Sequence, residues 1–271
     1  MDAGSQTPAD RAPSRRDAKG PPTLCIVEGD RERFDRSGLA RFEPLMGYAA
    51  AAESITRAVP GRFTARLELP GAPGEPSAVY FLKRYRRRNA ARAAAHEWRL
   101  LGETEARGIP CPRRVALGER RGLWGPVESL LVTAALPDAT QADWWIRERP
   151  ARRAELLSAV AALARRFHQA GLYHQDFYLC HFFVREPAGG MELSLIDFQR
   201  AGLHRGRRRW IVKDLAELLF SLRQEGYGPA DRSRFLELYG LSELYGDGAK
   251  GLERAIEAKA ARIARHVPKY G

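Results

Sequence analysis

GLYHQDFYLCHFF, residues 171–183, gathers His174, Asp176 and His181 among aromatic side chains and one cysteine. Such a stretch could be a metal site, a packed core strand or the catalytic loop of a phosphotransferase. The segment before it, residues 151–172, offers about five turns of helical pattern, and Gly171 is a typical helix stop signal. The stretch therefore opens as a loop that leaves a long helix.

Composition narrows the class of protein. A chain of 271 residues with 44% hydrophobic residues can form one large domain or two fused lobes. The net charge of +12 predicts an anionic partner such as nucleic acid, a phosphorylated glycan or an anionic membrane face. Three widely spaced cysteines without a C-x-x-C motif argue against a disulfide framework or a cysteine zinc site. A reducing cytoplasm fits best.

Residues 1–23 are rich in Pro, Ala, Arg, Gly and Asp and predict a disordered tail, because they cannot bury enough apolar surface to order themselves. They lack the apolar core of a signal peptide, and no run approaches the ~20 apolar residues that span a bilayer. We expect a soluble or peripheral protein.

The segment 24–137 predicts a small lobe made of a sheet and one helix. Strand patterns occupy residues 54–59, 63–69, 78–85, 112–119 and 127–136, and a helical pattern covers residues 89–108. After a short hinge at 134–138, the segment 138–271 is mainly helical, with helices at 151–172, 213–224, 232–240 and 251–267 and a strand at 193–198. This α+β arrangement, an antiparallel five-stranded lobe joined to a helical lobe, is the two-lobe organisation of protein kinases.

Phosphoryl transfer needs a cation on the nucleotide phosphates, a carboxylate that holds Mg²⁺ and a carboxylate that orients the attacking hydroxyl. Lys83 closes a strand and Glu97 lies fourteen residues later on the following helix, as in the kinase lysine–glutamate pair. Lys83 could also be one more basic residue of the run at 83–92. His174-Gln175-Asp176 matches the catalytic-loop signature of kinases, and an apolar strand delivers Asp197 twenty-one residues beyond Asp176. The ordered set is far more specific than any one member.

These motifs, with residues 193–201 and 207–221, closely resemble the lipopolysaccharide core heptose kinase family, a branch of the kinase-like fold, over roughly residues 50–225. The resemblance implies ATP and Mg²⁺ as cofactors, Asp176 as catalytic base within the His174 signature, Asp197 as Mg²⁺ ligand and Lys83 as phosphate-binding lysine. It also implies that Asp214 steadies the catalytic loop.

Two departures from protein kinases stand out. The turn at 59–62 replaces the Gly-rich lid, which leaves Gly61 and Arg62 as the candidates for covering the phosphates. His181 stands where kinases place the Asn that binds a second Mg²⁺, although Mg²⁺ prefers oxygen ligands. A metal ligand, a hydrogen bond to Asp176 or substrate, and a structural histidine all remain open for it.

Two further chemistries are weakly supported. His174, Cys180 and His181 have no common zinc-ligand spacing, and nothing in the sequence indicates a lowered pKa for a nucleophilic Cys180.

A second basic cluster, residues 200–213, follows Asp197. Such a run is ordinarily solvated surface, but its position after Asp197 favours binding of an anionic acceptor. The side chains assigned to the acceptor are Arg205, Arg207, Arg208 and Arg209. Trp210 could pack against a sugar or anchor the loop.

The resulting hypothesis is a kinase that phosphorylates the inner-core heptose of lipopolysaccharide, or a similar anionic glycolipid, at the cytoplasmic face of the inner membrane. An anionic membrane surface would be a second partner, and no nucleic acid is expected because no nucleic-acid motif accompanies the charge. The alternatives are a Kdo kinase or another small-molecule kinase, a protein kinase, and an inactive basic binding module.

Overall fold

A computed structural model describes residues 21–86 and 88–265. The chain divides into two compact units. Unit 1 comprises residues 1–102 and 112–135, and unit 2 comprises residues 103–111 and 136–271. The predicted tail falls largely on residues 1–20, outside the described residues, whereas Thr23 already belongs to a strand.

Unit 1 contains a fully antiparallel sheet of six strands, in the order β1-β5-β6-β4-β3-β2. The strands are β1 (Thr23–Ile26), β2 (Ile55–Val59), β3 (Arg62–Leu69), β4 (Ala78–Tyr85), β5 (Arg114–Gly122) and β6 (Gly125–Ala134). The expectation of five strands was wrong by one, since β1 is only four residues long and pairs with β5 far along the chain. A strand this short leaves too little period-2 pattern to be recognised locally.

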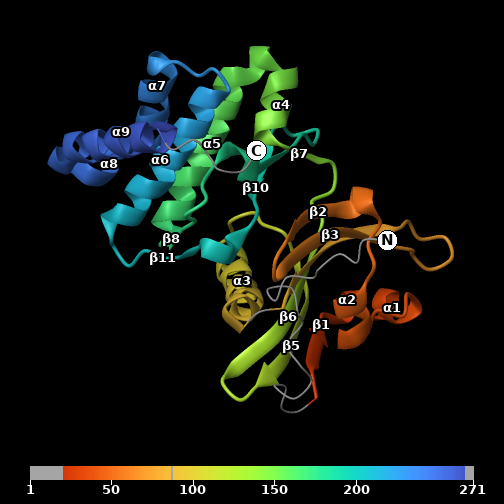
Figure 1. The fold of residues 1–271 in the computed structure, drawn as a ribbon. Coiled ribbons are helices and arrows are strands. Elements are labelled where there is room, and N and C mark those ends of the chain that lie inside the picture. The colour runs from red at the N-terminus through yellow and green to blue at the C-terminus, as the bar shows by residue number, and fades with distance from the viewer. Residues whose placement is uncertain (1–20, 87, 266–271) are drawn as a thin grey trace, which may run out of the picture. The chain divides into compact units, whose positions relative to one another are not determined.

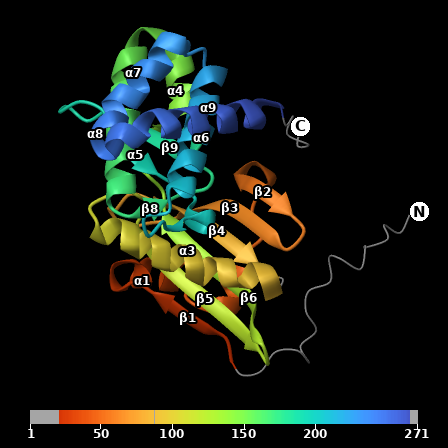
Figure 2. The ribbon, with the colours of Figure 1, turned by 90° about the vertical axis from the view of Figure 1, so that its left-hand side faces the viewer.

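Helices cover both faces of this sheet (Figures 1 and 2). One face packs on α1 (Glu28–Arg36) and α2 (Phe42–Gly47) through a core that includes Phe34, Leu45 and Leu82. The other face lies against the first part of α3 (Arg88–Ala106), where the Ser129 hydroxyl of β6 donates to the Ala91 carbonyl oxygen (2.6 Å). The predicted single helix is α3. The helices α1 and α2 and the 3₁₀ turn Ala52–Ser54 were not foreseen, because their segments are short.

Unit 2 is mainly helical. Its helices are α4 (Ala142–Glu148), α5 (Arg153–Gln169), α6 (Arg208–Gln224), α7 (Pro229–Tyr239), α8 (Leu241–Tyr245) and α9 (Ala249–Arg265), with 3₁₀ turns at Pro150–Arg152, Leu179–His181, Phe198–Arg200 and Gly246–Gly248. Helix α9 packs on α6, and α7 packs on α5. The four predicted helices correspond to α5, α6, α7 and α9, and residues 266–267 of the last lie outside the described part of the chain. Nowhere in the described residues is a helix both long and apolar enough to cross a membrane.

Two small sheets frame the loops of unit 2. Strand β8 (Leu172–Tyr173) pairs with β11 (Gly202–Leu203), while β9 (Phe182–Arg185) pairs with β10 (Glu192–Leu195) and with β7 (Ala139–Gln141). Loop 174–181 therefore runs from β8 to β9, and loop 196–201 runs from β10 to β11. Because their flanking strands pair at both ends, the two loops must lie side by side. These loops carry Asp176 and Asp197.

Candidate active site

In unit 1 the structure brings the predicted lysine and glutamate together. Alternate side chains of a strand point to opposite faces, so Lys83 points away from the core residue Leu82 and toward α3. Its Nζ donates to Oε1 of Glu97 at 2.5 Å, and the two side chains are only 12% and 2% exposed. A buried carboxylate needs such a partner. The pair fixes the ammonium group at the end of a central strand.

The turn that replaces the Gly-rich lid is short. Gly61 has φ 79°, a left-handed conformation that glycine adopts without steric cost, and its carbonyl oxygen accepts a hydrogen bond from the Arg86 N–H (3.1 Å). Arg62 begins β3 opposite Tyr85, two residues beyond Lys83 on the neighbouring strand. Gly61 and Arg62 thus lie at the same end of the sheet as Lys83.

Buried aromatic rings pack against the loops of unit 2 on their core side. Phe177, Phe182 and Phe198 are fully buried, and Phe177 stacks on Phe167 of α5 with 5.5 Å between ring centroids. By contrast, the Asp176 side chain is 28% exposed. Phe177 and Phe182 of the opening motif therefore belong to the core, while the Asp176 carboxylate remains accessible to a ligand.

Helix α6 holds the same loop through its backbone. Both carboxylate oxygens of Asp214 accept backbone hydrogen bonds, Oδ2 from the His174 N–H (2.7 Å) and Oδ1 from the Gln175 N–H (2.8 Å). Asp214 is fully buried, and Nε2 of His168 lies 3.3 Å from Oδ2. This is the loop-steadying contact that the family resemblance implies for Asp214.

Three further residues of α6 continue this clamp, and the sequence interpretation missed them. Glu217 Oε2 accepts from the Phe177 N–H (3.1 Å), and Ser221 Oγ accepts from the Leu179 N–H (2.9 Å). Lys213 Nζ donates to the Gln175 carbonyl oxygen and to Glu217 Oε1. Burial raises the pKa of Glu217 to about 7, although Lys213 opposes the shift. The spacing 214, 217, 221 along an apolar helix, which places these residues on one face, was the available signal.

Loop 196–201 is cross-linked to loop 174–181. The Gln175 side-chain amide donates to the Arg200 carbonyl oxygen (3.0 Å), and Arg200 Nη1 donates to Oδ1 of Asp176 (2.9 Å). Gln175 and Asp197 have φ values of 67° and 62°, which non-glycine residues adopt at a cost of about 1–3 kcal/mol each. The surrounding contacts hold both residues in these rare conformations, one on each loop.

The two histidines of the motif differ in exposure and in tautomer. His174 is completely buried, its Nε2 donates to the Ile196 carbonyl oxygen (2.9 Å), and burial lowers its pKa, so the ring is neutral. His181 Nδ1 donates to the Asp176 carbonyl oxygen (2.6 Å). Because a carbonyl oxygen can only accept, Nδ1 carries the proton, and Nε2 of a neutral His181 presents a lone pair.

Mg²⁺ and zinc call for different donor atoms. Mg²⁺ is commonly bound by one or two carboxylates together with phosphate oxygens and water, and Asp197 supplies such a carboxylate. The Nε2 atom of His181 is a less suitable ligand for a hard cation. Residues 21–86 and 88–265 contain no group of three or more His, Cys, Asp or Glu side chains that could hold a metal ion by themselves. Asp197 therefore offers one carboxylate, and a Mg²⁺ ion held there would take its remaining ligands from phosphate oxygens and water.

Cys180 is less reactive as a nucleophile than an ordinary cysteine. The side chain is partly buried, and burial raises its pKa to about 11, so the reactive thiolate is scarce near neutral pH.

The arginine segment, defined as Arg205, Arg207, Arg208 and Arg209, is exposed. No carboxylate of the described residues pairs with any of the four guanidinium groups. Arg207 is the N-cap residue of α6, and Arg208 and Arg209 begin its first turn, which has no acidic residue. Cations at the positive end of a helix dipole are unfavourable, so an anion bound beside these arginines would relieve their repulsion. Trp210 stacks on Tyr173 (centroids 4.6 Å apart) and thereby anchors the segment.

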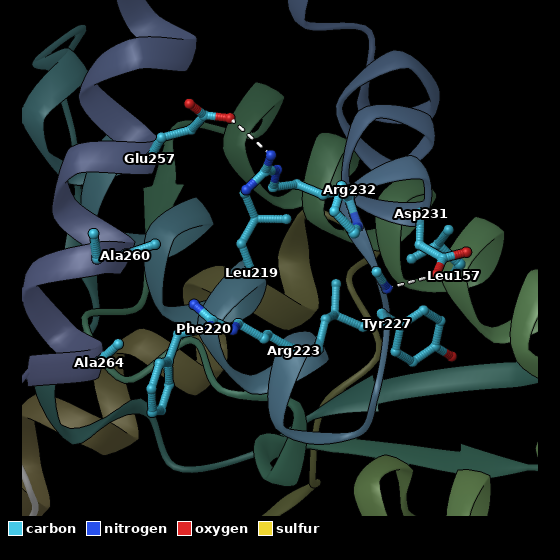
Figure 3. A pocket seen from close by; sticks show the side chains of 14 residues that line it. Leu157, Leu219, Phe220, Arg223, Tyr227, Asp231, Arg232, Glu257, Ala260 and Ala264 are labelled. Atoms are coloured by element: carbon cyan, nitrogen blue, oxygen red, sulfur yellow. Dashed lines mark hydrogen bonds and ion pairs between the residues drawn. The ribbon is translucent and has the colours of Figure 1, made fainter.

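A cavity of about 440 Å³ lies elsewhere in unit 2 (Figure 3). It opens among α5, α6, α7 and α9, with apolar lining from Leu157, Leu219 and Ala260. At its edge Arg232 Nη2 lies 3.3 Å from Glu257 Oε1. None of the predicted site residues lines this cavity.

An antiparallel sheet with a strand-lysine to helix-glutamate pair, and a helical unit with an H-x-D loop beside a strand-delivered aspartate, define a kinase-like phosphotransferase. The Lipopolysaccharide kinase (Kdo/WaaP) family model matches residues 80–239, and the chain belongs to this family. It is therefore an ATP-dependent phosphotransferase, and the predicted α+β fold class is confirmed.

Individual relatives agree with this assignment. The chain is 31% identical over 256 residues to the lipopolysaccharide core heptose(I) kinase WaaP of Pseudomonas aeruginosa, covering 84% of this chain and 93% of that protein. It is 34% identical over 184 residues to the protein of that name from Escherichia coli, covering 63% and 69%. A solved structure of WaaP in complex with acyl carrier protein has a TM-score of 0.69 and 30% identity, and the match covers 89% of this chain and 99% of that one.

Proposed function

We propose that this kinase transfers the γ-phosphoryl group of ATP to a hydroxyl of the inner-core heptose of lipopolysaccharide. The observation that carries the proposal is the accessible Asp176 carboxylate, on a loop that α6 holds through consecutive backbone N–H groups. Relatives that cover most of this chain are named as heptose kinases. Inner-core heptose is therefore the first acceptor to test.

Each residue has a defined part in the reaction. Asp176 orients the acceptor hydroxyl and accepts its proton, while Lys83, positioned by Glu97, binds phosphate oxygens of ATP. Asp197 would hold Mg²⁺, which when bound neutralises charge on the phosphates. Gly61 and Arg62 offer a backbone N–H and a cation to the same phosphates. His174, buried behind the loop, keeps loop 196–201 in place through Ile196.

His181 acts as a positioning residue in this proposal. Its Nδ1–H holds the Asp176 carbonyl oxygen, which fixes the backbone that carries the carboxylate. Its Nε2 lone pair could either accept a hydrogen bond from a substrate hydroxyl or coordinate the metal. Replacement of His181 by Asn, which can supply an oxygen ligand, separates the two roles, because only a metal role predicts retained Mg²⁺ dependence and activity.

The arginine segment binds the anionic acceptor and the anionic membrane surface on which that glycolipid resides. Four exposed cations without carboxylate partners among the described residues would match phosphates and acidic sugars. Juxtamembrane basic clusters gain about 1 kcal/mol per Lys or Arg near an anionic surface. We place the protein peripherally at the cytoplasmic face of the inner membrane.

The direct test incubates the purified chain with ATP, Mg²⁺ and core lipopolysaccharide from which phosphate has been removed. Phosphate appearing on heptose supports the proposal, whereas nucleotide binding without phosphate transfer counts against this acceptor. A parallel reaction with Kdo-terminated core separates the heptose from Kdo, which the family's description also names. Transfer only to Kdo would move the acceptor assignment to a Kdo kinase.

A protein partner is proposed from the solved relative, whose structure is a complex with acyl carrier protein. The match covers nearly all of that chain, and the net charge of +12 would favour an acidic partner. Co-elution of the two purified proteins in size-exclusion chromatography at low and high salt tests this pairing. Separate elution at both salt concentrations would argue against it.

A further inference from the structure

Arg200 contacts the proposed base, Asp176, through an ion pair that adds little to the stability of the fold. Its Nη1 donates to Oδ1 of Asp176 at 2.9 Å, and its side chain is 56% exposed. Within the described residues no other acceptor binds its guanidinium group, so four of the five N–H donors remain free for a ligand. An exposed ion pair of this kind contributes little stability, about 0–1 kcal/mol.

The position of Arg200 is nevertheless fixed. Its carbonyl oxygen accepts the Gln175 side-chain amide, and it ends the 3₁₀ turn Phe198–Arg200 that begins directly after Asp197. Phe198 is completely buried beneath this turn. The backbone of Arg200 is therefore anchored to both loops, whereas its guanidinium group is exposed next to a carboxylate that must face the reacting hydroxyl.

We propose that Arg200 is a catalytic residue whose guanidinium group binds the phosphoryl group during its transfer. This inference rests on the proposed kinase function. The acceptor oxygen forms a bond to the γ-phosphorus while the bond to the β–γ bridging oxygen breaks, and ADP leaves with that electron pair. The hydroxyl proton passes to Asp176. A hydroxyl hydrogen-bonded to Asp176 brings the γ-phosphorus close to that carboxylate, within reach of the free donors of Arg200.

Two features of the site make an arginine suitable here. Its planar fork can hold Asp176 Oδ1 with one nitrogen and a phosphoryl oxygen with another, which a lysine cannot do with the same geometry. The second oxygen of Asp176, Oδ2, accepts no hydrogen bond within the described residues, so it is available to the acceptor hydroxyl. Arg200 thus orients the base and neutralises charge on the transferred group.

The test compares four forms of the full chain with ATP, Mg²⁺ and dephosphorylated core lipopolysaccharide: wild type, Arg200→Gln, Arg200→Lys and Arg200→Ala. The control is Arg185→Gln, which breaks an exposed ion pair with Glu192 (2.6 Å) on the β9–β10 strands. We expect Arg200→Gln to lower kcat at least about 10²-fold, because arginines that stabilise phosphoryl transfer contribute roughly 10³–10⁵. The ATP Kd and the Tm should stay near wild type. Arg200→Lys should be intermediate, and Arg185→Gln should match wild type.

A rescue experiment separates catalysis from structure. Millimolar guanidinium chloride, but not sodium chloride, should restore part of the kcat of Arg200→Ala. A kcat of Arg200→Gln within threefold of wild type overturns the inference, as does an effect confined to acceptor KM or a parallel loss of Tm. Wild-type transfer with an unaffected Arg200→Gln rejects only the role of Arg200. Absence of transfer by the wild type rejects the proposed function and this role with it.

Discussion

Loop 174–181 follows β8 and the arginine segment at 205–209 follows β11, so they extend from opposite ends of the same short strand pair. The two regions nevertheless differ in how their side chains are held. The loop is bound through its backbone by Asp214, Glu217 and Ser221 and is filled beneath by buried aromatic rings. The arginine segment is exposed, and its charges have no carboxylate partners among the described residues. The loop proposed to carry the chemistry is thus fixed by many contacts, whereas the segment proposed to meet an anionic ligand keeps its charges without carboxylate partners among the described residues.

The largest effect should come from the accessible carboxylate of the rigid loop, that of Asp176. Asp176→Asn should reduce kcat by at least about 10²-fold with little change in ATP affinity, because general-base positioning contributes roughly 10²–10⁴. Steady-state transfer assays and calorimetric ATP titration measure the two quantities. Asp247→Asn removes an exposed carboxylate elsewhere in unit 2 and should leave both unchanged. Near-normal turnover of Asp176→Asn would remove Asp176 from the base role.

Next in size should be the loss of the helix contact that fixes the loop. Asp214→Asn places an amide NH₂ group where two backbone N–H donors converge, so at least one buried donor loses its acceptor. We expect about 2–4 kcal/mol of lost stability, with a matching fall in kcat. Urea unfolding followed by circular dichroism measures the stability. Asp231→Asn, where one oxygen accepts the Gly228 N–H at the start of α7, should cost about 1 kcal/mol and spare kcat. Equal losses in the two variants would contradict a special role for Asp214.

Part of the candidate site was predictable from the sequence, because the proposed chemistry calls for particular residue types. Lys83, Glu97, Asp176 and Asp197 were proposed because phosphoryl transfer demands those residue types in a set order. The structure places Lys83 on β4, Glu97 on α3, and Asp176 and Asp197 on the two loops of unit 2. The chemistry does not require particular residue types at the clamp positions Lys213, Glu217 and Ser221. A polar side chain on a helix is usually solvated, and only the tertiary fold turned these inward.

Other features depended on distant contacts. Strand β1 is stabilised by pairing with β5, and four residues are too few to show a recognisable strand pattern in the sequence. Arg200 was hidden inside the basic run at 200–213, where it is indistinguishable by type from its neighbours. Its contact with Asp176 follows from the pairing of β8 with β11 and β9 with β10, which brings the two loops together.

A smaller, pH-dependent effect should distinguish Glu217 within the clamp. Its folded-state pKa of about 7 lies above the ordinary 4.5, so between these values the folded protein binds more protons than the unfolded chain. The stability that Glu217 contributes is therefore complete below pH 4.5 and is lost as the pH rises to about 7. Glu217→Gln keeps an acceptor for the Phe177 N–H but cannot ionise.

The Tm difference between Glu217→Gln and wild type should accordingly become more favourable to the variant from pH 5 to pH 8, by the equivalent of roughly 1–3 kcal/mol. Thermal unfolding at both pH values measures it. Glu237→Gln, on the exposed face of α7, should show no such trend. A pH-independent difference for Glu217→Gln would mean that the carboxyl titrates alike in the folded and unfolded states.

The smallest effect should arise in the arginine segment, where each contact is exposed to solvent. The double replacement Arg207→Gln with Arg208→Gln should raise acceptor KM roughly three- to tenfold, about 1 kcal/mol, and weaken its dependence on salt. ATP KM and kcat should barely change. The Tm should hold or rise slightly, because two cations leave the positive end of α6.

Lys250→Gln with Arg254→Gln removes the same charge from exposed positions on α9 and provides the matched control. If that pair raises acceptor KM equally, only the net charge matters, and the arginine segment is not a defined acceptor site. If instead ATP KM rises while acceptor KM and its salt dependence stay constant, the segment serves the nucleotide, and the contrast between a rigid catalytic loop and an acceptor-binding arginine segment fails.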